Sequence, residues 1–135
     1  MPHRVALIGN NSHQLSLKAL LAERGGFDVV VIDGGNGYED GLAKTPSDIV
    51  IVDEDAVSNS WQMCSKIRSE SAVPIIMVGH SDNILSWAKA AKYGVEFYAK
   101  RPIQPLELIA RIRALLRRYE QQLYKYTNDR AWNTK

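Results

Sequence analysis

The sequence predicts an α/β protein built on one doubly wound sheet of five parallel strands. Short apolar runs alternate with helical patterns along all 135 residues, and strands buried on both faces of a parallel sheet have such continuous apolar runs. The connections are short, and right-handed crossovers then leave helices on both faces of the sheet. The length suits one domain with a single buried core.

Glycines and prolines mark where the elements end. The first helix carries three leucines on one face and stops at Gly25-Gly26. Pro74 introduces the fourth strand, Gly94 ends the fourth helix, and Pro105 fits the first turn of the last helix. The predicted order is strand 5–8, helix 12–24, strand 27–32, helix 38–44, strand 49–52, helix 60–70, strand 75–78, helix 83–93, strand 96–99 and a last helix from Pro105.

The last helix continues beyond the predicted core. Apolar residues follow alternating spacings of three and four. Only the last half of this series lies beyond the core, and that length is short of the three to four heptads that indicate a coiled coil. The residues of the series are Ile109, Ile112, Leu116, Tyr119, Leu123 and Tyr126. We therefore expect a domain at 1–118 and a helical extension or linker at 119–135, frayed from 127, that pairs with a partner or leads to a further segment.

Composition excludes several classes of protein. Hydrophobic content of 45% and charged content of 24% are those of a soluble globular protein. No apolar stretch approaches the roughly 18 residues of a membrane span, and the N-terminus lacks the apolar region of a secretory signal. The lone Cys64 fits a buried position, so cytoplasmic residence is expected. His3 and His13 are isolated and imply no metal cluster, and His80 is interpreted as a loop residue.

Charge is distributed unevenly along the chain. Residues 1–110 carry 10 Lys/Arg and 13 Asp/Glu, whereas residues 111–135 carry 7 and 2. The basic residues are spread out, so a solvated helix face is a simpler interpretation than contact with nucleic acid or an acidic partner, which stays open.

Asp53 directly follows the apolar run 49–52. A carboxylate just past the end of a buried parallel strand opens into the crevice where ligands bind in such sheets. It can accept a phosphoryl group or hold a metal there, but both tasks usually need further acids. The first strand ends in Gly9-Asn10-Asn11 and supplies none. The sequence therefore indicates a phosphoacceptor-like domain that lacks most of its chemistry.

Four segments resemble the receiver domain of bacterial two-component response regulators, which has the CheY-like fold. They are 47–53 (Ser-Asp-Ile-Val-Ile-Val-Asp), 73–78 (Val-Pro-Ile-Ile-Met-Val), 98–103 (Tyr-Ala-Lys-Arg-Pro-Ile) and 105–118 in the last helix. The last segment is closest to the subfamily that carries winged-helix output domains. The resemblance spans 4–118 and implies the strand order 2-1-3-4-5. It also implies transcription regulation, with DNA contacted only through an output domain absent from this chain.

The departures from the family pattern fall on its functional positions. Gly9 and Asn10 stand where the resemblance implies an acidic pair that holds Mg²⁺. Gly79 stands in place of a Ser or Thr, and Arg101 in place of a Lys. Mg²⁺ affinity depends largely on carboxylate charge, and phosphoryl transfer depends on the metal. We therefore expect weak or absent Mg²⁺ binding, no other cofactor, and a chain that is an atypical receiver.

Asp53, the phosphoacceptor equivalent, and Tyr98, the switch-like aromatic, are the retained family residues. Arg101 is expected to pair with Asp53, because a planar guanidinium suits a carboxylate better than an ammonium does. The absent hydroxyl at Gly79 removes the group that would pull Tyr98 inward, so Tyr98 is expected to be a packed or partly exposed aromatic rather than a working switch. Glu54 and Asp55 are expected to be solvated loop acids.

The resemblance also implies a two-fold interface formed by the fourth helix, fifth strand and last helix. Lys89, Glu107 and Arg111 match its charged partners, and Phe97 replaces an acid. With Ile112 they would form an apolar centre and a charged rim, a workable isologous interface. We expect a constitutive homodimer.

The leading hypothesis is a signalling, dimerisation and protein-interaction module that is not an enzyme and is independent of Asp53 phosphorylation. One alternative is a conventional phosphorylated receiver with a degraded magnesium site. Another is a stand-alone adaptor that docks on a histidine kinase or scaffold. Residues 53–57 also fit the nucleophile motif of haloacid-dehalogenase-like phosphatases. In that family, however, the motif lies on the first strand of the fold, whereas here it comes at the third.

Overall fold

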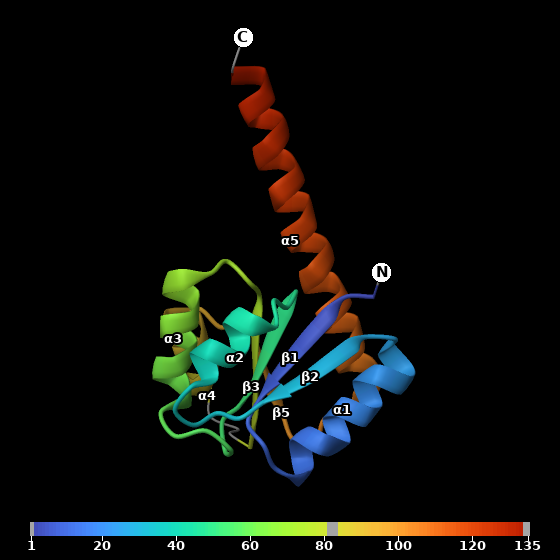
Figure 1. Cartoon of the computed structure of the whole chain (residues 1–135), viewed down its shortest axis with the longest axis vertical. Helices are drawn as coiled ribbons and strands as arrows, with labels where there is room; N and C mark the ends of the chain where they lie inside the picture. Colours follow the sequence, from blue (N-terminus) through green and yellow to red (C-terminus); the bar gives the residue numbers. More distant parts are fainter. Residues whose placement is uncertain (1, 81–83, 134–135) are drawn as a thin grey trace.

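The computed structural model describes residues 2–80 and 84–133, with side chains described for 2–80 and 88–125. Five parallel strands form one sheet in the order β2-β1-β3-β4-β5, with helices on both faces (Figure 1). This confirms the predicted fold class and strand order. The strands are β1 (Arg4–Ile8), β2 (Asp28–Ile32), β3 (Ile49–Asp53), β4 (Ile75–Gly79) and β5 (Phe97–Lys100). The helices are α1 (Ser12–Gly25), α2 (Tyr38–Lys44), α3 (Ser60–Glu70), α4 (Ile84–Lys92) and α5 (Pro105–Asn133).

The predicted elements are present, and apart from the C-terminal end of α5 their described ends agree to within one residue. β5 begins at Phe97 rather than Glu96. Just before the strand, the Glu96 carboxylate accepts the Ile75 N–H (2.6 Å) and pairs with Arg68 (2.5 Å). The predicted start of α4 at Asn83 lies outside the described residues.

Alternate residues of each strand pack on opposite faces of the sheet, as the period of a strand requires. Val5 and Leu7 pack with the buried faces of α1 and α5. Ala6 and Ile8 pack with Trp61 and other buried residues of α3 on the opposite face. The core therefore has two layers, and the sheet between them is buried on both sides (Figure 1).

Cys64 is a buried, free cysteine on α3, as the sequence predicted. Burial, reinforced by the negative charge of Glu96, raises the pKa of its thiol to about 12. Because the thiolate is the reactive form, this side chain serves as a small core residue.

The first turns of α5 face the core, and this corrects one expectation. Ile109, Ile112 and Leu116 are buried against the sheet, and Ile112 is 0% exposed. Ile112 was predicted to be an interface residue, but it cannot touch a partner because its side chain fills the layer beneath α5. A spacing of three and four residues is expected both for a helix face packed in the core and for one packed on a partner, so the spacing alone could not distinguish the two.

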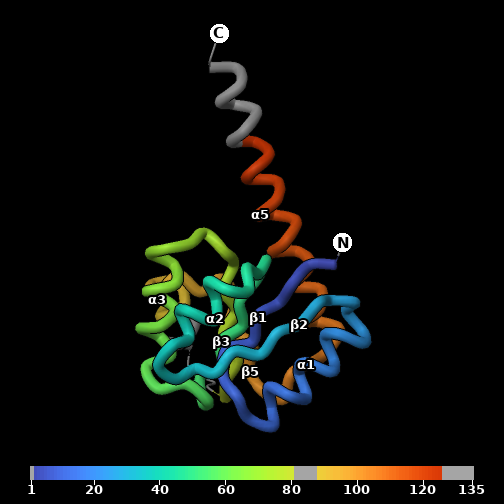
Figure 2. Tube along the Cα trace, in the orientation of Figure 1, coloured from blue at the N-terminus to red at the C-terminus, as the bar shows by residue number. Residues whose placement is uncertain are grey.

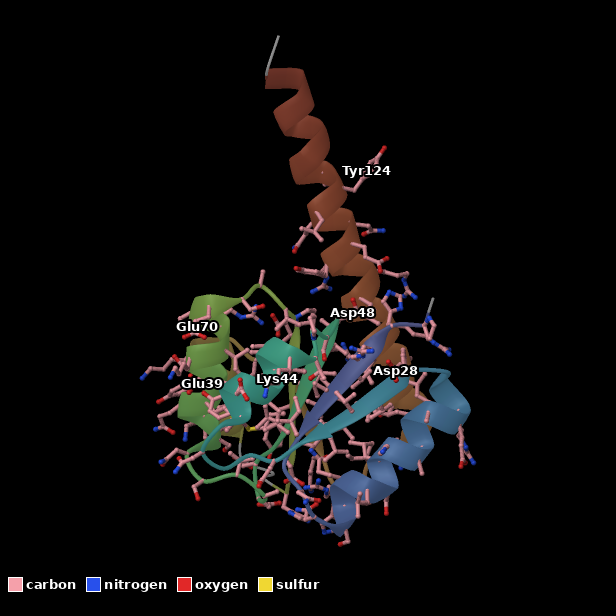
Figure 3. The ribbon with its side chains drawn as sticks, viewed as in Figure 1. Asp28, Glu39, Lys44, Asp48, Glu70 and Tyr124 are labelled. Carbon is pink, nitrogen blue, oxygen red and sulfur yellow. The ribbon has the colours of Figure 1, made fainter. Side chains whose placement is uncertain are left out.

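Beyond Leu116, α5 rises away from the sheet and passes the start of the chain, where His3 contacts Glu120 at 2.6 Å (Figures 1 and 2). Tyr124 projects from this part of the helix and is largely exposed (Figure 3). The helix continues to Asn133, whereas frayed chain was expected from 127. Tyr126 is the last of the apolar residues spaced by three and four, and its side chain lies outside the described residues. Across the described residues, no helix has both the length and the apolar character needed to cross a membrane.

Candidate functional site

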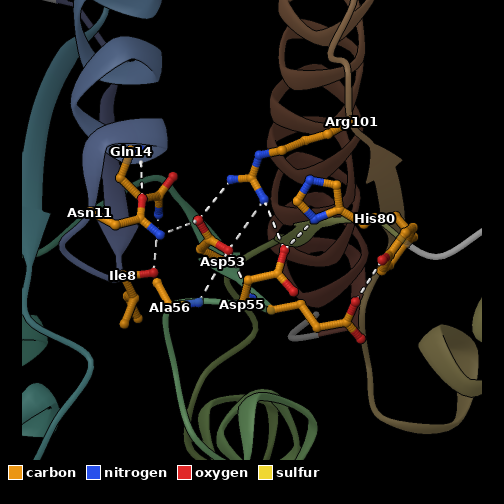
Figure 4. A network of polar contacts seen from close by, with 10 residues as sticks. Ile8, Asn11, Gln14, Asp53, Asp55, Ala56, His80 and Arg101 are labelled. Atoms are coloured by element: carbon orange, nitrogen blue, oxygen red, sulfur yellow. Dashed lines mark hydrogen bonds and ion pairs between the residues drawn. The ribbon is translucent and has the colours of Figure 1, made fainter.

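Asp53 is the last residue of β3, and its side chain is completely buried. The ends of parallel strands meet at one edge of the sheet, so the segments that follow β1, β4 and β5 surround this carboxylate. Figure 4 shows Asn11 and Arg101 converging on it, whereas His80, after β4, contacts the neighbouring Asp55. The crevice predicted from the sequence is therefore filled by protein groups.

Arg101, directly after β5, contacts both oxygens of the Asp53 carboxylate. Its Nη2 donates to Oδ2 at 2.7 Å and its Nη1 to Oδ1 at 3.3 Å (Figure 4). The Arg101 side chain is only 8% exposed. The pairing predicted from the sequence is confirmed, and Arg101 rather than the exposed Lys100 makes it. Two-point contact of this kind fixes the geometry of both side chains.

Three further donors complete the surroundings of Asp53. The backbone N–H groups of Asp55 and Ala56 donate to Oδ1 at 2.9 and 3.3 Å, and Asn11 Nδ2 donates to Oδ2 at 3.3 Å. Asn11 is also the N-cap of α1, since its Oδ1 accepts the Gln14 N–H at 3.0 Å. One amide side chain thus ties the start of α1 to the carboxylate.

The hydrogen bonds determine the protonation of Asp53. Burial alone would raise the pKa of its carboxyl. The hydrogen bonds from Arg101 and the Asp55 amide, the guanidinium charge and the Asn11 amide together outweigh burial and hold the pKa below its usual value. Asp53 is therefore an enclosed but ionised carboxylate.

Gly9 lies so close to the β3–α3 loop that a side chain does not fit. Its φ is +118°, and an added Cβ would lie 2.9 Å from the Ala56 Cβ and 3.2 Å from the Asp53 Cβ. The neighbouring Asn10 is exposed. Gly9 and Asn10 were the site positions predicted from the sequence, but Asn11 is the residue of this segment whose side chain reaches Asp53. The sequence could have indicated Asn11 as a structured residue, because it directly precedes a helical pattern and Asn is a preferred N-cap.

Asp55 and His80 extend the polar network toward solvent. His80 Nδ1 lies 2.6 Å from Asp55 Oδ2, which Arg101 Nη1 also reaches at 3.4 Å (Figure 4). The ring of His13 on α1 packs edge-on against the His80 ring, with centroids 6.2 Å apart. Asp55 is part-exposed as expected, but it is paired rather than simply solvated. Within residues 2–80 and 88–125, no three His, Cys, Asp or Glu side chains form a group that could hold a metal ion.

Glu54 differs from the expectation, whereas Tyr98 is a packed aromatic, one of the two states expected for it. Tyr98 is 1% exposed, and its hydroxyl donates to Glu54 Oε1 at 2.6 Å. Glu54 Oε2 accepts the indole N–H of Trp61 at 2.9 Å. Glu54 is thus a bonded, half-buried acid rather than a solvated one. Tyr98 lies inward although no hydroxyl stands at Gly79, because Glu54 supplies the acceptor.

The side chains predicted for an interface lie on α4, β5 and α5. Lys89, Glu107 and Arg111 are exposed and Phe97 is partly exposed. The Arg111 guanidinium covers the Phe97 ring at 4.8 Å from its centroid, and the Lys89 ammonium lies 5.0 Å from the Trp61 ring. Both cations therefore pack on aromatic rings of their own chain.

Comparison with known proteins links this site to a family. No protein-family model matches the chain. The DNA-binding response regulator MtrA of Mycolicibacterium smegmatis is 27% identical over 123 residues, which are 90% of this chain and 54% of that protein. The sensory transduction protein RegX3 of the same organism is 34% identical over 101 residues, covering 74% of this chain and 44% of that protein. The chain thus spans about half the length of the curated relatives it matches.

Solved structures share the fold over most of the chain. The receiver domain of the TMAO respiratory system response regulator TorR has a TM-score of 0.76 at 23% identity, covering 87% of this chain and 98% of that one. The chemotaxis response regulator CheY4 of Vibrio cholerae has a TM-score of 0.74 at 15% identity, covering 85% and 99%. Sheet order and these neighbours define the fold as the CheY-like receiver fold.

With the sequence relatives added, the chain belongs to the response regulators and is a receiver domain of that family. The phosphatase interpretation of residues 53–57 fails, because Asp53 follows β3 of a receiver fold.

Proposed function

We propose that this chain is an atypical receiver domain, a signalling module that works through protein contacts without phosphorylation of Asp53. The observation that carries the proposal is the contact of Arg101 with both oxygens of the buried Asp53 carboxylate. A phosphoacceptor must offer one free oxygen to the incoming phosphorus. Here each oxygen accepts at least two donors, counting Asn11 and the loop amides.

The donor set around Asp53 does not fit the magnesium ion of the family. Mg²⁺ requires oxygen ligands in near-octahedral geometry and takes one or two carboxylates in protein sites. Position 9 has no side chain and no room for one, and Asn10 offers only an exposed amide. The guanidinium of Arg101 would also lie within a few ångströms of the metal and repel it. We propose that Arg101 itself supplies the positive charge at this site.

The relatives suggest the larger setting. Because the chain spans about half the length of MtrA and RegX3, we propose that it serves a longer regulator with a DNA-binding output domain of the winged-helix type. MtrA is named a DNA-binding response regulator, which supports this setting. We propose homodimerisation through Lys89, Phe97, Glu107 and Arg111, and a histidine kinase or other protein as a further partner.

A phosphorylation assay tests the central proposal. The purified chain is incubated with acetyl phosphate and Mg²⁺, and the intact mass is followed together with the backbone amide signals of Asp53, Asp55 and Ala56. We expect an unchanged mass and no saturable shift of these signals at low millimolar Mg²⁺. The physical reason is that phosphorylation must first break the Asp53–Arg101 pair.

A double variant, Asn10→Asp with Arg101→Lys, is the matched comparison. It restores an acid and the family lysine without entering the closed space at Gly9, and it should bind Mg²⁺ more tightly than the natural chain. A stable phosphoryl adduct on Asp53 of the natural chain would overturn the proposal.

A further inference from the structure

We propose that Glu54 is a positioning residue that joins the loop after β3 to the outer surface of α4 by holding Tyr98 and Trp61 at once. This inference rests on the proposed function, since it names what holds Tyr98 inward in the absence of a phosphoryl group. Glu54 directly follows Asp53, and its backbone N–H donates to the Val78 carbonyl at 2.9 Å. Its backbone is therefore fixed to the end of β4.

The two carboxylate oxygens of Glu54 serve rings from different elements. Oε1 accepts the Tyr98 hydroxyl of β5 at 2.6 Å, and Oε2 accepts the Trp61 indole N–H of α3 at 2.9 Å. The two rings lie nearly parallel, with centroids 6.2 Å apart and an interplanar angle of 7°. Tyr98 and Trp61 are both buried, so each loses water at its polar group. A buried donor without an acceptor is costly, and a single carboxylate satisfies both.

Gly79 provides the space for this arrangement. A Cβ added at Gly79 would lie 2.3 Å from the Tyr98 hydroxyl oxygen and 2.5 Å from Glu54 Oε1. The Tyr98–Glu54 hydrogen bond therefore occupies the volume that any side chain at position 79 would need. The absence of a side chain at Gly79 and the inward position of Tyr98 therefore depend on each other.

The contacts continue to the surface of α4. The Tyr93 ring packs on Trp61 with centroids 5.8 Å apart, and the exposed Lys89 ammonium lies 5.0 Å from the Trp61 ring. Lys89 is one of the residues that we place in the dimer surface. A continuous series of contacts thus runs from Glu54, beside Asp53, through Trp61 to a charged surface position. Such a packed series is the physical route by which two sites can be coupled.

Variants of Glu54 and Gly79 test the inference. The measured signals are the indole N–H of Trp61 and the backbone amide of Lys89 in two-dimensional NMR, with the Trp61 signal assigned from a Trp61→Phe spectrum. Glu54→Ala should displace both signals. Glu54→Gln should displace them less, because it keeps one acceptor. Gly79→Ser should displace them while leaving the carboxylate in place, since the added Cβ forces Tyr98 or Glu54 to move.

Glu39→Ala is the matched control, because Glu39 is an exposed carboxylate that pairs with Lys66 on α3 at 2.8 Å. This change should leave the signals of Trp61 and Lys89 in place. Circular dichroism confirms that each variant is folded, and the Gln and Ser variants remain informative if Glu54→Ala unfolds. Trp61 and Lys89 signals in folded Glu54→Gln and Gly79→Ser that match the natural chain would overturn the inference. A phosphoryl adduct on Asp53 would instead contradict the proposed function, so the two failures are distinguishable.

Discussion

At the scale of single residues, the central fact is that a fully enclosed carboxylate keeps its charge. An isolated buried charge is expensive, and partners must compensate it. Asp53 has a guanidinium, one side-chain amide and two backbone amides. These partners come from the segments after β1, β3 and β5, so the ion pair also joins separate parts of the fold.

This arrangement predicts how stability depends on pH. The pKa of Asp53 is lower in the folded protein than its ordinary value of 3.8. The unfolded chain therefore binds the proton more readily, and the contribution of Asp53 is fully present above that value. It is lost as the pH falls from about 4 through the lower pKa of the folded state. In urea unfolding between pH 7 and pH 3, the free energy of unfolding should decline more steeply with falling pH than it does in Asp53→Asn. Equal slopes for the two proteins would contradict the ionised buried carboxylate.

Residue-level prediction succeeded for the ion pair, in two steps. The family resemblance placed Arg101 at the position of the lysine near the phosphoacceptor, and the fit of a planar guanidinium to a carboxylate then predicted the contact. The roles of Asn11 and Glu54 were missed. Glu54 and Tyr98 are 44 positions apart, and no local pattern shows that an absent side chain at Gly79 leaves room for them to meet.

At the scale of elements, α5 has a core-facing part and an extended part. Through Leu116 its apolar face is buried, whereas Leu106 in its first turn is 73% exposed and Leu123 is 50% exposed. Helical periodicity predicted the helix well, because Pro105 and the apolar spacing mark it clearly. The direction of the apolar face could not be predicted, since a helix packed on a sheet and a helix packed on a partner share one period.

Two alanine variants separate these faces. Ile112→Ala should destabilise the domain by about 2–5 kcal/mol, because it empties space in a close-packed layer. Leu106→Ala should change the free energy of unfolding by only about 0.5 kcal/mol, as is usual for surface substitutions. Denaturant unfolding measures both. A small effect of Ile112→Ala would show that α5 does not pack as described.

At the scale of the whole molecule, the fold was the most predictable feature. Apolar runs without alternation, short connections and glycine stops indicated a parallel sheet with helices on both faces. The strand order came from the family resemblance, since it needs pairing information that no single segment contains.

Assembly is also tested at this scale. We expect the chain to form a homodimer in solution without a phosphoryl donor. Exposed ion pairs are worth only about 0–1 kcal/mol each, so the charge reversal Glu107→Lys should loosen association rather than abolish it. Phe97→Asp should have the larger effect. Sedimentation velocity at tens of micromolar measures both, with Glu23→Lys on α1 as the control.

A natural chain that sediments as a monomer would reject the dimer. If the Phe97 and Glu107 variants associate as tightly as the control, the interface lies elsewhere on the molecule.

The amides of Asp55 and Ala56 anchor the loop after β3 at two consecutive residues. Both N–H groups end on the same buried carboxylate that Arg101 and Asn11 hold. Releasing both amides would leave Oδ1 with the Arg101 Nη1 donor alone, at 3.3 Å. We therefore expect opening of this surface loop to be coupled to the start of α1 and to the segment after β5, which hold the same carboxylate. The stability of this short irregular segment is thus linked to that of the strand ends around it.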